Sequence, residues 1–332
     1  MPNKKVLVTG GAGYIGSHMI DLLLSDGFEV VAIDNFSNSQ AGNLNIKAAF
    51  IEGDIADEKL VKNIFANHQI HAVFHFAAAI EAGESMLNPA FYYRNNVANS
   101  LSLIDLVIRY SPKSHFIFSS SAAVYEAKND LIKEDDKKNP ASIYGKTKLI
   151  VEEALFDCAK AHNLSYGILR YFNACGANWQ KNLGENRQVE SHLIPLLLRF
   201  LNRQDIEFFV NGNDYQTLDG TCVRDYVHVK DICAAHLKTL NYLENAGDEK
   251  CFNIGTGHGF SVLEIIKKAE EISGKKLPIN YKKRREGDAD SLVASNELAR
   301  KVLGWQPEFS SLDEIISSAW KWEKLQFKQK NL

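Results

Sequence analysis

A tyrosine and a lysine four residues apart could form a proton-transfer pair. Tyr144 and Lys148 stand at the ends of the segment Y-G-K-T-K, so a helix that begins there carries both on one face. A free phenol has a pKa near ~10 and is a poor base at neutral pH. A positive charge about 5 Å away, at an effective dielectric constant of ~20, favours the phenolate by roughly 3 kcal/mol. Taken alone, the pair is more typical of a helix start beside a surface lysine.

A serine triplet upstream could hold a substrate hydroxyl. The serines at 119–121 close a predicted strand that begins at His115, and ligands bind at this end of the strands in open parallel sheets. Ser121 is the candidate for holding the hydroxyl and passing its proton, with Tyr144 as the general base. Lys148 and a second positive charge beside the phenol are expected to lower the pKa of Tyr144 towards neutrality.

A glycine-rich turn near the start could bind a pyrophosphate. The segment V-L-V-T-G-G-A-G-Y-I-G over residues 6–16 predicts a strand, a turn and a helix start, where backbone N–H groups and the helix dipole favour an anion. The glycines fit a dinucleotide pattern either as 11, 13 and 16 or as 10, 13 and 16. The preceding threonine favours the second assignment.

An acidic residue follows the second predicted strand. Asp34 lies at the distance beyond the glycines where a carboxylate accepts hydrogen bonds from the adenosine ribose. It would repel a 2′-phosphate, and residues 35–40 contain no arginine or lysine to receive one, so NAD is favoured over NADP. Asp54, at the end of the third strand, could reach the adenine, although a plain turn residue is equally consistent.

Short apolar strands alternate with helices through the first half. This pattern predicts an α/β fold with a Rossmann-type doubly wound parallel sheet. After residue 172 polar loops become frequent, so we expect an NAD-binding domain over 1–172 and a smaller mixed α/β substrate domain over 173–332, with some segments returning to the first. The expected strands are 6–9, 29–33, 50–53, 72–76, 115–119, 166–171 and 223–229. Helices are expected over 59–66, 144–162 and 193–201. Further helices are expected to begin at 14, 231, 261, 296 and 312, and a long one is expected to end near 109.

Composition and charge limit the partners. The 332 residues carry a formal net charge of -3 with scattered lysine and arginine, so neither nucleic acid nor an anionic membrane surface is expected as a partner. The start lacks the apolar run of a signal peptide, and no run approaches the ~18 residues of a membrane span. Five cysteines without a C-x-x-C pair predict reduced thiols in a cytoplasm, and no metal site is expected.

Short motifs run through the chain in a fixed order. They are V-T-G-G-A-G-Y-I-G-S-H, D-N-F-S-N-S, E-G-D-I, H-F-A-A, G-E-S, Y-Y-R-N-N-V, F-S-S-S-A-A-V-Y, Y-G-K-T-K, L-R-Y-F-N, G-N-D-Y, D-G-T-C-V-R-D-Y-V-H-V, F-N-I-G-T-G and R-R-E-G-D. Over essentially the whole chain this set resembles the UDP-glucose 4-epimerase family of the extended short-chain dehydrogenase/reductase superfamily. The resemblance implies tightly bound NAD, a UDP-hexose substrate and a homodimer.

The resemblance also implies roles for individual residues. It implies NAD contacts at Gly10, Gly13, Tyr14, Ile15, Gly16, Asp34, Asn35, Asp54, Ile55, Phe76, Ala77, Ala78, Asn95, Tyr144, Lys148 and Phe172. It implies substrate contacts at Ser121, Tyr144, Asn173, His192, Leu193, Arg224, Arg285, Asp288 and Leu292. Two arginines facing a diphosphate also make independent sense, because guanidinium groups bind phosphate oxygens in a bidentate manner. A surface ion pair is the alternative for either arginine alone.

Several positions depart from the family pattern. Ile80 replaces a lysine near the cofactor, so one positive charge is missing. Asn211 stands where an aromatic side chain often packs against uracil, and Ala123 replaces a threonine that can touch the sugar. Ala78 and Glu126 replace glycines, which alters local loop shape. None of these changes removes Ser121, Tyr144 or Lys148.

The residues after the serines favour epimerisation over related reactions. Dehydratases that resemble this chain need an extra acid and base there, and a decarboxylase needs a glutamate, whereas this chain has Ala122 and Ala123. Epimerisation at C4 through a 4-keto sugar needs no such group. Leu292, rather than a bulky tyrosine, leaves UDP-N-acetylhexosamines open as substrates.

Three other functions remain compatible with the sequence. An epimerase of another UDP sugar, such as a uronate or a pentose, would share every catalytic residue. An inactive NAD-binding regulator would keep only the fold, against which the intact Ser121, Tyr144 and Lys148 argue. An ordinary dehydrogenase would release NADH. A homodimer through helices over 90–109 and 144–162 is expected from the resemblance, but their apolar residues could equally face only the chain's own sheet.

Overall fold

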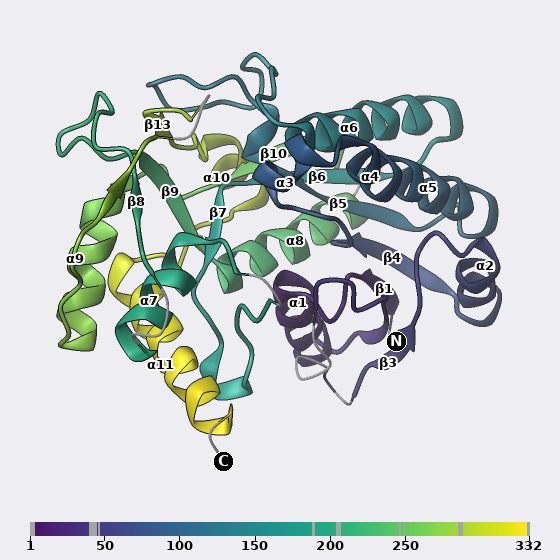
Figure 1. Ribbon diagram of the computed structural model, residues 1–332. Helices are drawn as coiled ribbons and strands as arrows, with labels where there is room; N and C mark the ends of the chain where they lie inside the picture. Colours follow the sequence, from purple (N-terminus) through teal and green to yellow (C-terminus); the bar gives the residue numbers. More distant parts are fainter. Residues whose placement is uncertain are drawn as a thin grey trace.

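The centre of the protein is a parallel sheet. The computed structural model describes residues 4–330 except 40–44, 46, 188–189, 204–206, 246, 249 and 285–287. Seven strands of this described part pair in parallel in the order β10-β6-β5-β4-β1-β2-β3 (Figure 1). They are β1 Lys5–Thr9, β2 Glu29–Asp34, β3 Ala49–Glu52, β4 Ile70–His75, β5 His115–Ser121, β6 Tyr166–Tyr171 and β10 Lys250–Ile254. The order changes direction between β1 and β4, where ligands bind in sheets of this kind.

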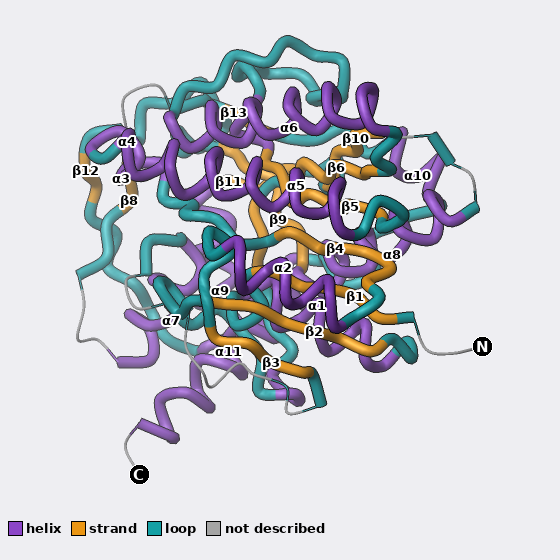
Figure 2. The backbone as a smooth tube through the Cα atoms, turned by 90° about the vertical axis from the view of Figure 1, so that its right-hand side faces the viewer, coloured by secondary structure: helices purple, strands orange, loops and turns teal. Residues whose placement is uncertain are grey.

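Helices cover both faces of this sheet, so the predicted doubly wound fold is confirmed. On one face, α2 (Glu58–Asn67), α5 (Asn99–Tyr110) and α6 (Ile143–His162) pack against strand residues such as Leu7, Val73 and Phe118 (Figure 2). On the other face lie α1 (Tyr14–Ser25), α8 (Val229–Glu244) and α10 (Glu297–Leu303). Alternate residues of each strand thus enter opposite cores, which explains the continuously apolar strands.

Two elements from the second half of the chain complete the first sheet. Strand β10 pairs with β6, and α8 packs on the same face as α1. The strand was not predicted, because K-C-F-N-I places a polar residue fourth among its five positions. That residue, Asn253, is fully buried, accepts a hydrogen bond from Tyr125 Oη at 2.7 Å and donates one to the Ile132 carbonyl at 2.9 Å. The domain boundary at residue 172 stays a prediction.

The remaining elements form a smaller mixed lobe. Its strands are β7 Asn173–Cys175, β8 Val210–Asn211, β9 Val223–His228, β11 Gly259–Ser261, β12 Tyr281–Lys282 and β13 Ser291–Leu292. Three helices, α7 (Leu193–Arg203), α9 (Val262–Ser273) and α11 (Leu312–Lys330), share a separate apolar core and lie together in Figure 1. Of the strands in this lobe only β9 was predicted, because the others are too short to show a period.

Short elements shape the edge of the main sheet where its strands end. They are α3 Ala82–Leu87, α4 Pro89–Tyr92, a π-helical turn Tyr93–Ala98 and a 3₁₀ turn Ala122–Val124. The single long helix predicted to end near residue 109 is therefore three elements in the structure. The π-helical turn turns Asn96 towards Ala79, with two hydrogen bonds of 2.8 and 2.9 Å to its backbone. Among the described helices none is long and apolar enough to cross a membrane.

Candidate active site

The turn after β1 can be built only with glycine at two positions. Gly10 has φ +70°, and a Cβ there would lie 2.8 Å from the Ala77 nitrogen. A Cβ on Gly16 would lie 2.1 Å from the Gly10 oxygen. Helix α1 has no acidic residue in its first turn, and its N-cap residue, Gly13, makes no side-chain capping bond. Its first N–H groups are therefore available to an anion.

Asp34 fixes the shape of this turn. Its two carboxylate oxygens accept hydrogen bonds from the Ala12 nitrogen at 3.0 Å, the Phe36 nitrogen at 2.8 Å and the Ser39 hydroxyl at 2.8 Å. The side chain is nearly buried and still borders the cavity. The carboxylate therefore links β2 to the glycine turn and faces the predicted ribose position.

One cavity of about 660 Å³ joins the carboxyl ends of the main strands to the smaller lobe. Most of the residues predicted to contact NAD line it: Gly10, Gly13, Tyr14, Ile15, Gly16, Asp34, Asn35, Asp54, Ile55, Phe76, Ala77, Ala78, Asn95, Tyr144 and Phe172. The predicted substrate residues that line it are Ser121, Tyr144, Asn173, His192, Leu193, Arg224 and Asp288. Residues from both halves of the chain therefore share one space.

The candidate proton-transfer groups lie where β5 meets α6. Tyr144 is in the first turn of α6, is hydrogen-bonded to Ser121, and its backbone nitrogen donates to Ser85 Oγ at 3.0 Å. Lys148 does not line the cavity. Its ammonium donates to the Ser119 carbonyl at 2.9 Å and lies 5.9 Å from the centre of the Tyr144 ring. The structure therefore brings the three predicted residues together. Ser121 and Tyr144 line the cavity, whereas Lys148 lies behind Tyr144, outside the lining.

Burial and the neighbouring groups act on the titration of this group in opposite directions. Burial raises the pKa of Tyr144, while the hydrogen bond from Ser121 and the charge of Arg187 lower it. Burial lowers the pKa of Lys148 to about 7, and Glu152 opposes that change. From the protein's own groups the net shift of the Tyr144 pKa is upward, because burial disfavours the phenolate more than its neighbours favour it. The lowering by Lys148 together with an oxidised nicotinamide ring stays a prediction.

The substrate side of the cavity carries a charged pair. Arg224 Nη2 lies 2.5 Å from Asp288 Oδ1, and the Tyr215 hydroxyl donates to Asp288 Oδ2 at 2.9 Å. Asn173 Nδ2 donates to the Asp225 carbonyl at 2.9 Å. This arrangement holds one guanidinium at the cavity wall in a defined position.

Other predicted positions lie elsewhere. Leu292 does not line the cavity and packs beside a buried cluster that includes Phe172. Arg285 lies outside the described residues. Of the departures from the family pattern, Ile80 and Asn211 line the cavity, whereas Ala123 and Glu126 do not.

Known proteins were compared with this chain. The family model described as "NAD dependent epimerase/dehydratase family" matches residues 6–255. The chain belongs to this family. A UDP-glucose 4-epimerase of Halalkalibacterium halodurans is 42% identical over 96% of this chain and 95% of its own length. The crystal structure of the Brucella ovis UDP-glucose 4-epimerase in complex with NAD has a TM-score of 0.91, with 41% identity over 96% of this chain and 97% of that chain.

A further solved structure contains a second ligand. The Bifidobacterium longum UDP-glucose 4-epimerase in complex with NAD⁺ and UDP has a TM-score of 0.91, with 36% identity over 99% of both chains. As a member of the NAD-dependent family, this chain uses NAD. The residues present fit that cofactor, because the uncapped start of α1 suits a pyrophosphate and the Asp34 carboxylate suits ribose hydroxyls.

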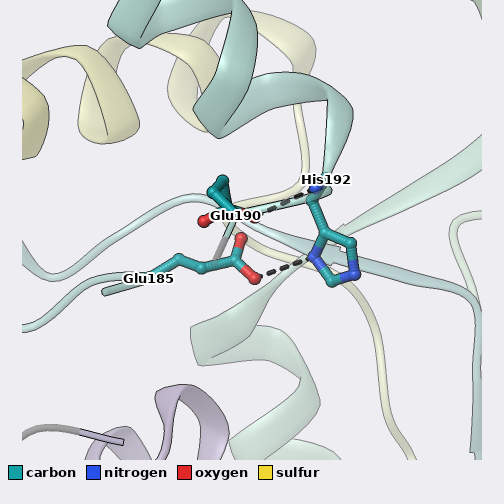
Figure 3. Close-up of side chains that lie close together, drawn as sticks. All are labelled: Glu185, Glu190 and His192. Atoms are coloured by element: carbon teal, nitrogen blue, oxygen red, sulfur yellow. Dashed lines mark hydrogen bonds and ion pairs between the residues drawn. The ribbon is translucent and has the colours of Figure 1, made fainter. Parts of the chain in front are cut away.

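Sequence reasoning missed an ionic cluster at the mouth of the cavity. Arg187 lines the cavity and lies 2.7 Å from Glu81 and 2.8 Å from Glu185. A carboxylate oxygen of Glu185 also lies 2.8 Å from Nδ1 of the His192 imidazole (Figure 3). A carboxylate oxygen of Glu190 accepts a hydrogen bond from the backbone nitrogen of His192 at 2.9 Å. The only sequence signal was the density of charge over residues 185–192.

This cluster has the donor atoms of a cation site. Ligand atoms of Glu185, Glu190 and His192 lie within 4.8 Å of one another. Their negative charge is already opposed by Arg187 on Glu185 and by Arg199, whose Nη2 is 3.6 Å from Glu190. The cluster is therefore better explained as an ion-pair network that holds the segment carrying His192 and Leu193.

Proposed function

We propose that this chain interconverts UDP-glucose and UDP-galactose by inverting C4 of the hexose. The observation that carries this proposal is the cavity that Ser121 and Tyr144 line from the side of the main sheet and Arg224 lines from the smaller lobe. Alanines occupy positions 122 and 123, where a dehydratase needs an acid and a base. The site thus offers proton transfer at one hydroxyl, and these two positions supply no acid or base for eliminating another.

The chain's own residues handle the proton of the C4 hydroxyl. Ser121 holds that hydroxyl, and Tyr144, as phenolate, takes its proton through the hydrogen bond between the two side chains. NAD, held by the glycine turn and Asp34, would supply a reversible hydride acceptor for C4, so that the resulting 4-keto sugar can be reduced on either face. Tyr144 then returns the proton to the C4 oxygen, so the cycle consumes no cofactor.

The smaller lobe retains the nucleotide while the keto sugar rotates. Arg224 is placed to bind a diphosphate oxygen, because a guanidinium that already pairs with Asp288 has further N–H groups to donate. Asn173, His192 and Leu193 line the same wall. Binding through the UDP, away from the reacting carbon, lets the hexose rotate without dissociation.

The choice of sugar depends on the space beside the hexose. Leu292 packs into the cluster under Phe172 rather than at the cavity surface, so it acts on that space through its neighbours. The tolerance of UDP-N-acetylhexosamines stays a prediction. Absence of turnover of UDP-N-acetylglucosamine at high enzyme concentration would exclude it.

The direct test is conversion without added cofactor. The purified protein is incubated with UDP-galactose alone, and UDP-glucose is separated by chromatography, with Tyr144→Phe as the control. Conversion by the parent protein only supports epimerisation with retained NAD. No conversion, even with NAD added, would indicate that the substrate is another UDP sugar. Failure with every UDP sugar would favour an inactive NAD-binding protein.

We also propose that the chain forms a homodimer in the cytoplasm. Large apolar side chains are exposed on the α3–α6 side: Met86, Leu87, Phe91, Tyr93, Leu101 and Phe156. Exposed apolar clusters of this kind mark interfaces. None of the five cysteines forms a disulfide, which suits a reducing compartment. Light scattering of the parent protein and of Leu87→Asp tests the dimer, which fails if the parent is monomeric.

A further inference from the structure

The stripe of α6 that carries Tyr144 and Lys148 continues to a third polar residue. Glu152 lies one helical turn beyond Lys148, so the three side chains share one face of the helix. The Lys148 ammonium donates to the Ser119 carbonyl, and the Ser120 hydroxyl donates to a Glu152 carboxylate oxygen. Successive residues of β5 therefore bind successive turns of α6. The proposed mechanism gives Lys148 and Tyr144 a role but gives Glu152 none.

Glu152 is held in the core by an arginine of β6. Arg170 Nε lies 2.9 and 3.2 Å from the two carboxylate oxygens, and Arg170 Nη2 lies 2.5 Å from one of them. The Glu152 and Arg170 side chains are only 5% and 6% exposed. Arg170 Nη1 also bonds the Tyr125 hydroxyl at 2.6 Å and the Glu134 carbonyl at 3.1 Å. A buried pair that is this fully bonded cannot shift without cost, so the carboxylate is fixed.

The carboxylate acts on a lysine that burial would otherwise discharge. Burial lowers the pKa of Lys148 to about 7 even though the charge of Glu152 raises it. The other titratable groups facing Lys148 are Tyr144 on its own helix and His75 on β4. The pKa of His75 is lowered to about 3 by its own burial and by Lys148, so this imidazole is neutral at physiological pH. Glu152 therefore decides how much positive charge Lys148 keeps.

We propose that Glu152, seated by Arg170 and Ser120, is a positioning residue that keeps the Lys148 ammonium charged beside Tyr144. This inference rests on the proposed epimerase function. Tyr144 and Lys148 titrate together, so the form that has lost one proton is either phenolate with ammonium or phenol with amine. Since Glu152 is one turn from Lys148 and two from Tyr144, its charge favours the phenolate with ammonium, which is the active form.

The test compares two variants in which neighbouring glutamates are replaced by glutamine. Glu152→Gln removes the buried charge, whereas Glu153→Gln makes the same change at the neighbouring exposed position of α6. For the NAD-loaded Glu152→Gln enzyme we expect the plateau value of kcat to fall about tenfold and the acid limb of the pH profile to move about one unit lower, so that the rates of the variant and the parent converge below the limb. KM for the UDP sugar stays unchanged, Glu152→Asp restores part of kcat, and Glu153→Gln behaves as the parent.

A second measurement follows the lysine without relying on turnover. Protein with carbon-13-labelled lysine is titrated by NMR, and the Lys148 signal is assigned by its loss in Lys148→Arg. Its midpoint should fall by about one pH unit in Glu152→Gln and stay in place in Glu153→Gln. If Glu152→Gln does not fold, the double variant Glu152→Gln/Arg170→Met, which leaves no unpaired buried charge, is measured instead.

The outcomes separate the two proposals. A folded Glu152 variant with the parent's pH profile and the parent's Lys148 midpoint overturns the positioning role, even if its thermal stability is lower. A parent protein that converts no UDP sugar overturns the epimerase function. In that case the Lys148 midpoint still shows whether Glu152 controls the lysine charge.

Discussion

The two sides of the cavity are built in different ways. On the nucleotide side, strands of a regular sheet end beside a turn in which backbone atoms approach each other so closely that Gly10 and Gly16 are required. On the sugar side, short strands and loops present charged groups, such as Arg224 on Asp288 and Arg187 on Glu81 and Glu185. Backbone packing has few alternatives, whereas ion pairs can exchange partners. We therefore expect substitutions on the nucleotide side to abolish function and those on the sugar side to reduce it by degrees.

The largest effect is expected where the two sides meet the reacting carbon. Tyr144→Phe removes the hydroxyl that we propose takes the proton from the substrate hydroxyl at Ser121, while the ring and its packing remain. We expect kcat to fall by about 10³-fold, with NAD and UDP-sugar binding retained. Steady-state rates with UDP-galactose measure this. A loss below tenfold would mean that another group transfers the proton.

The next effect tests whether backbone packing makes the nucleotide side all-or-none. Gly16→Ala places a Cβ 2.1 Å from the Gly10 oxygen, so the turn must open at a cost of about 1–3 kcal/mol. We expect loss of co-purifying NAD, measured by its absorbance after heat release. Gly83→Ala is the control, because a Cβ there meets nothing within 4 Å. Full NAD occupancy in Gly16→Ala would contradict the comparison.

A graded effect is expected at the sugar side. Arg224→Met removes the proposed diphosphate contact and leaves Asp288 with the Tyr215 hydroxyl as a partner. Hydrogen bonds to charged groups contribute about 1.5–3 kcal/mol, so KM for UDP-galactose should rise about 10- to 100-fold with kcat little changed. Arg109→Met, at an exposed arginine paired with Asp105, is the control. An unchanged KM would show that Arg224 does not bind the substrate.

The smallest effect concerns the ionic cluster at the cavity mouth. Burial lowers the pKa of His192, but Glu185 raises it more, so the net shift is upward. A raised pKa adds stability that is complete below the unfolded value of about 6.5 and disappears as the pH rises through the higher folded value. The imidazole is 41% exposed, so screening keeps the effect small. Thermal unfolding of the parent and of His192→Gln is compared across pH: the stability difference between them should be largest at pH 6 and should shrink as the pH rises. A difference that grows with pH would contradict this sign.

The same contrast explains how much the sequence could reveal. Apolar periodicity and the glycine pattern predicted β1, β2, β4, β5, β6 and the start of α6, since long regular elements leave a repeated signal. Short strands such as β8 and β12 leave none. Arg187 was missed because its role depends on Glu81, more than 100 residues earlier in the chain. The position of Lys148 behind Tyr144, and the direction of the Tyr144 pKa, depend on burial, which spacing alone does not report.

The central claim is that hydrogen leaves C4 and returns to the same carbon within one site. UDP-galactose carrying deuterium at C4 is incubated with the purified protein in ordinary water without added NAD, and the product is examined by mass spectrometry and NMR. The account predicts UDP-glucose that keeps its deuterium at C4. Product that has lost the deuterium to solvent, or conversion that stops without fresh NAD, would contradict it.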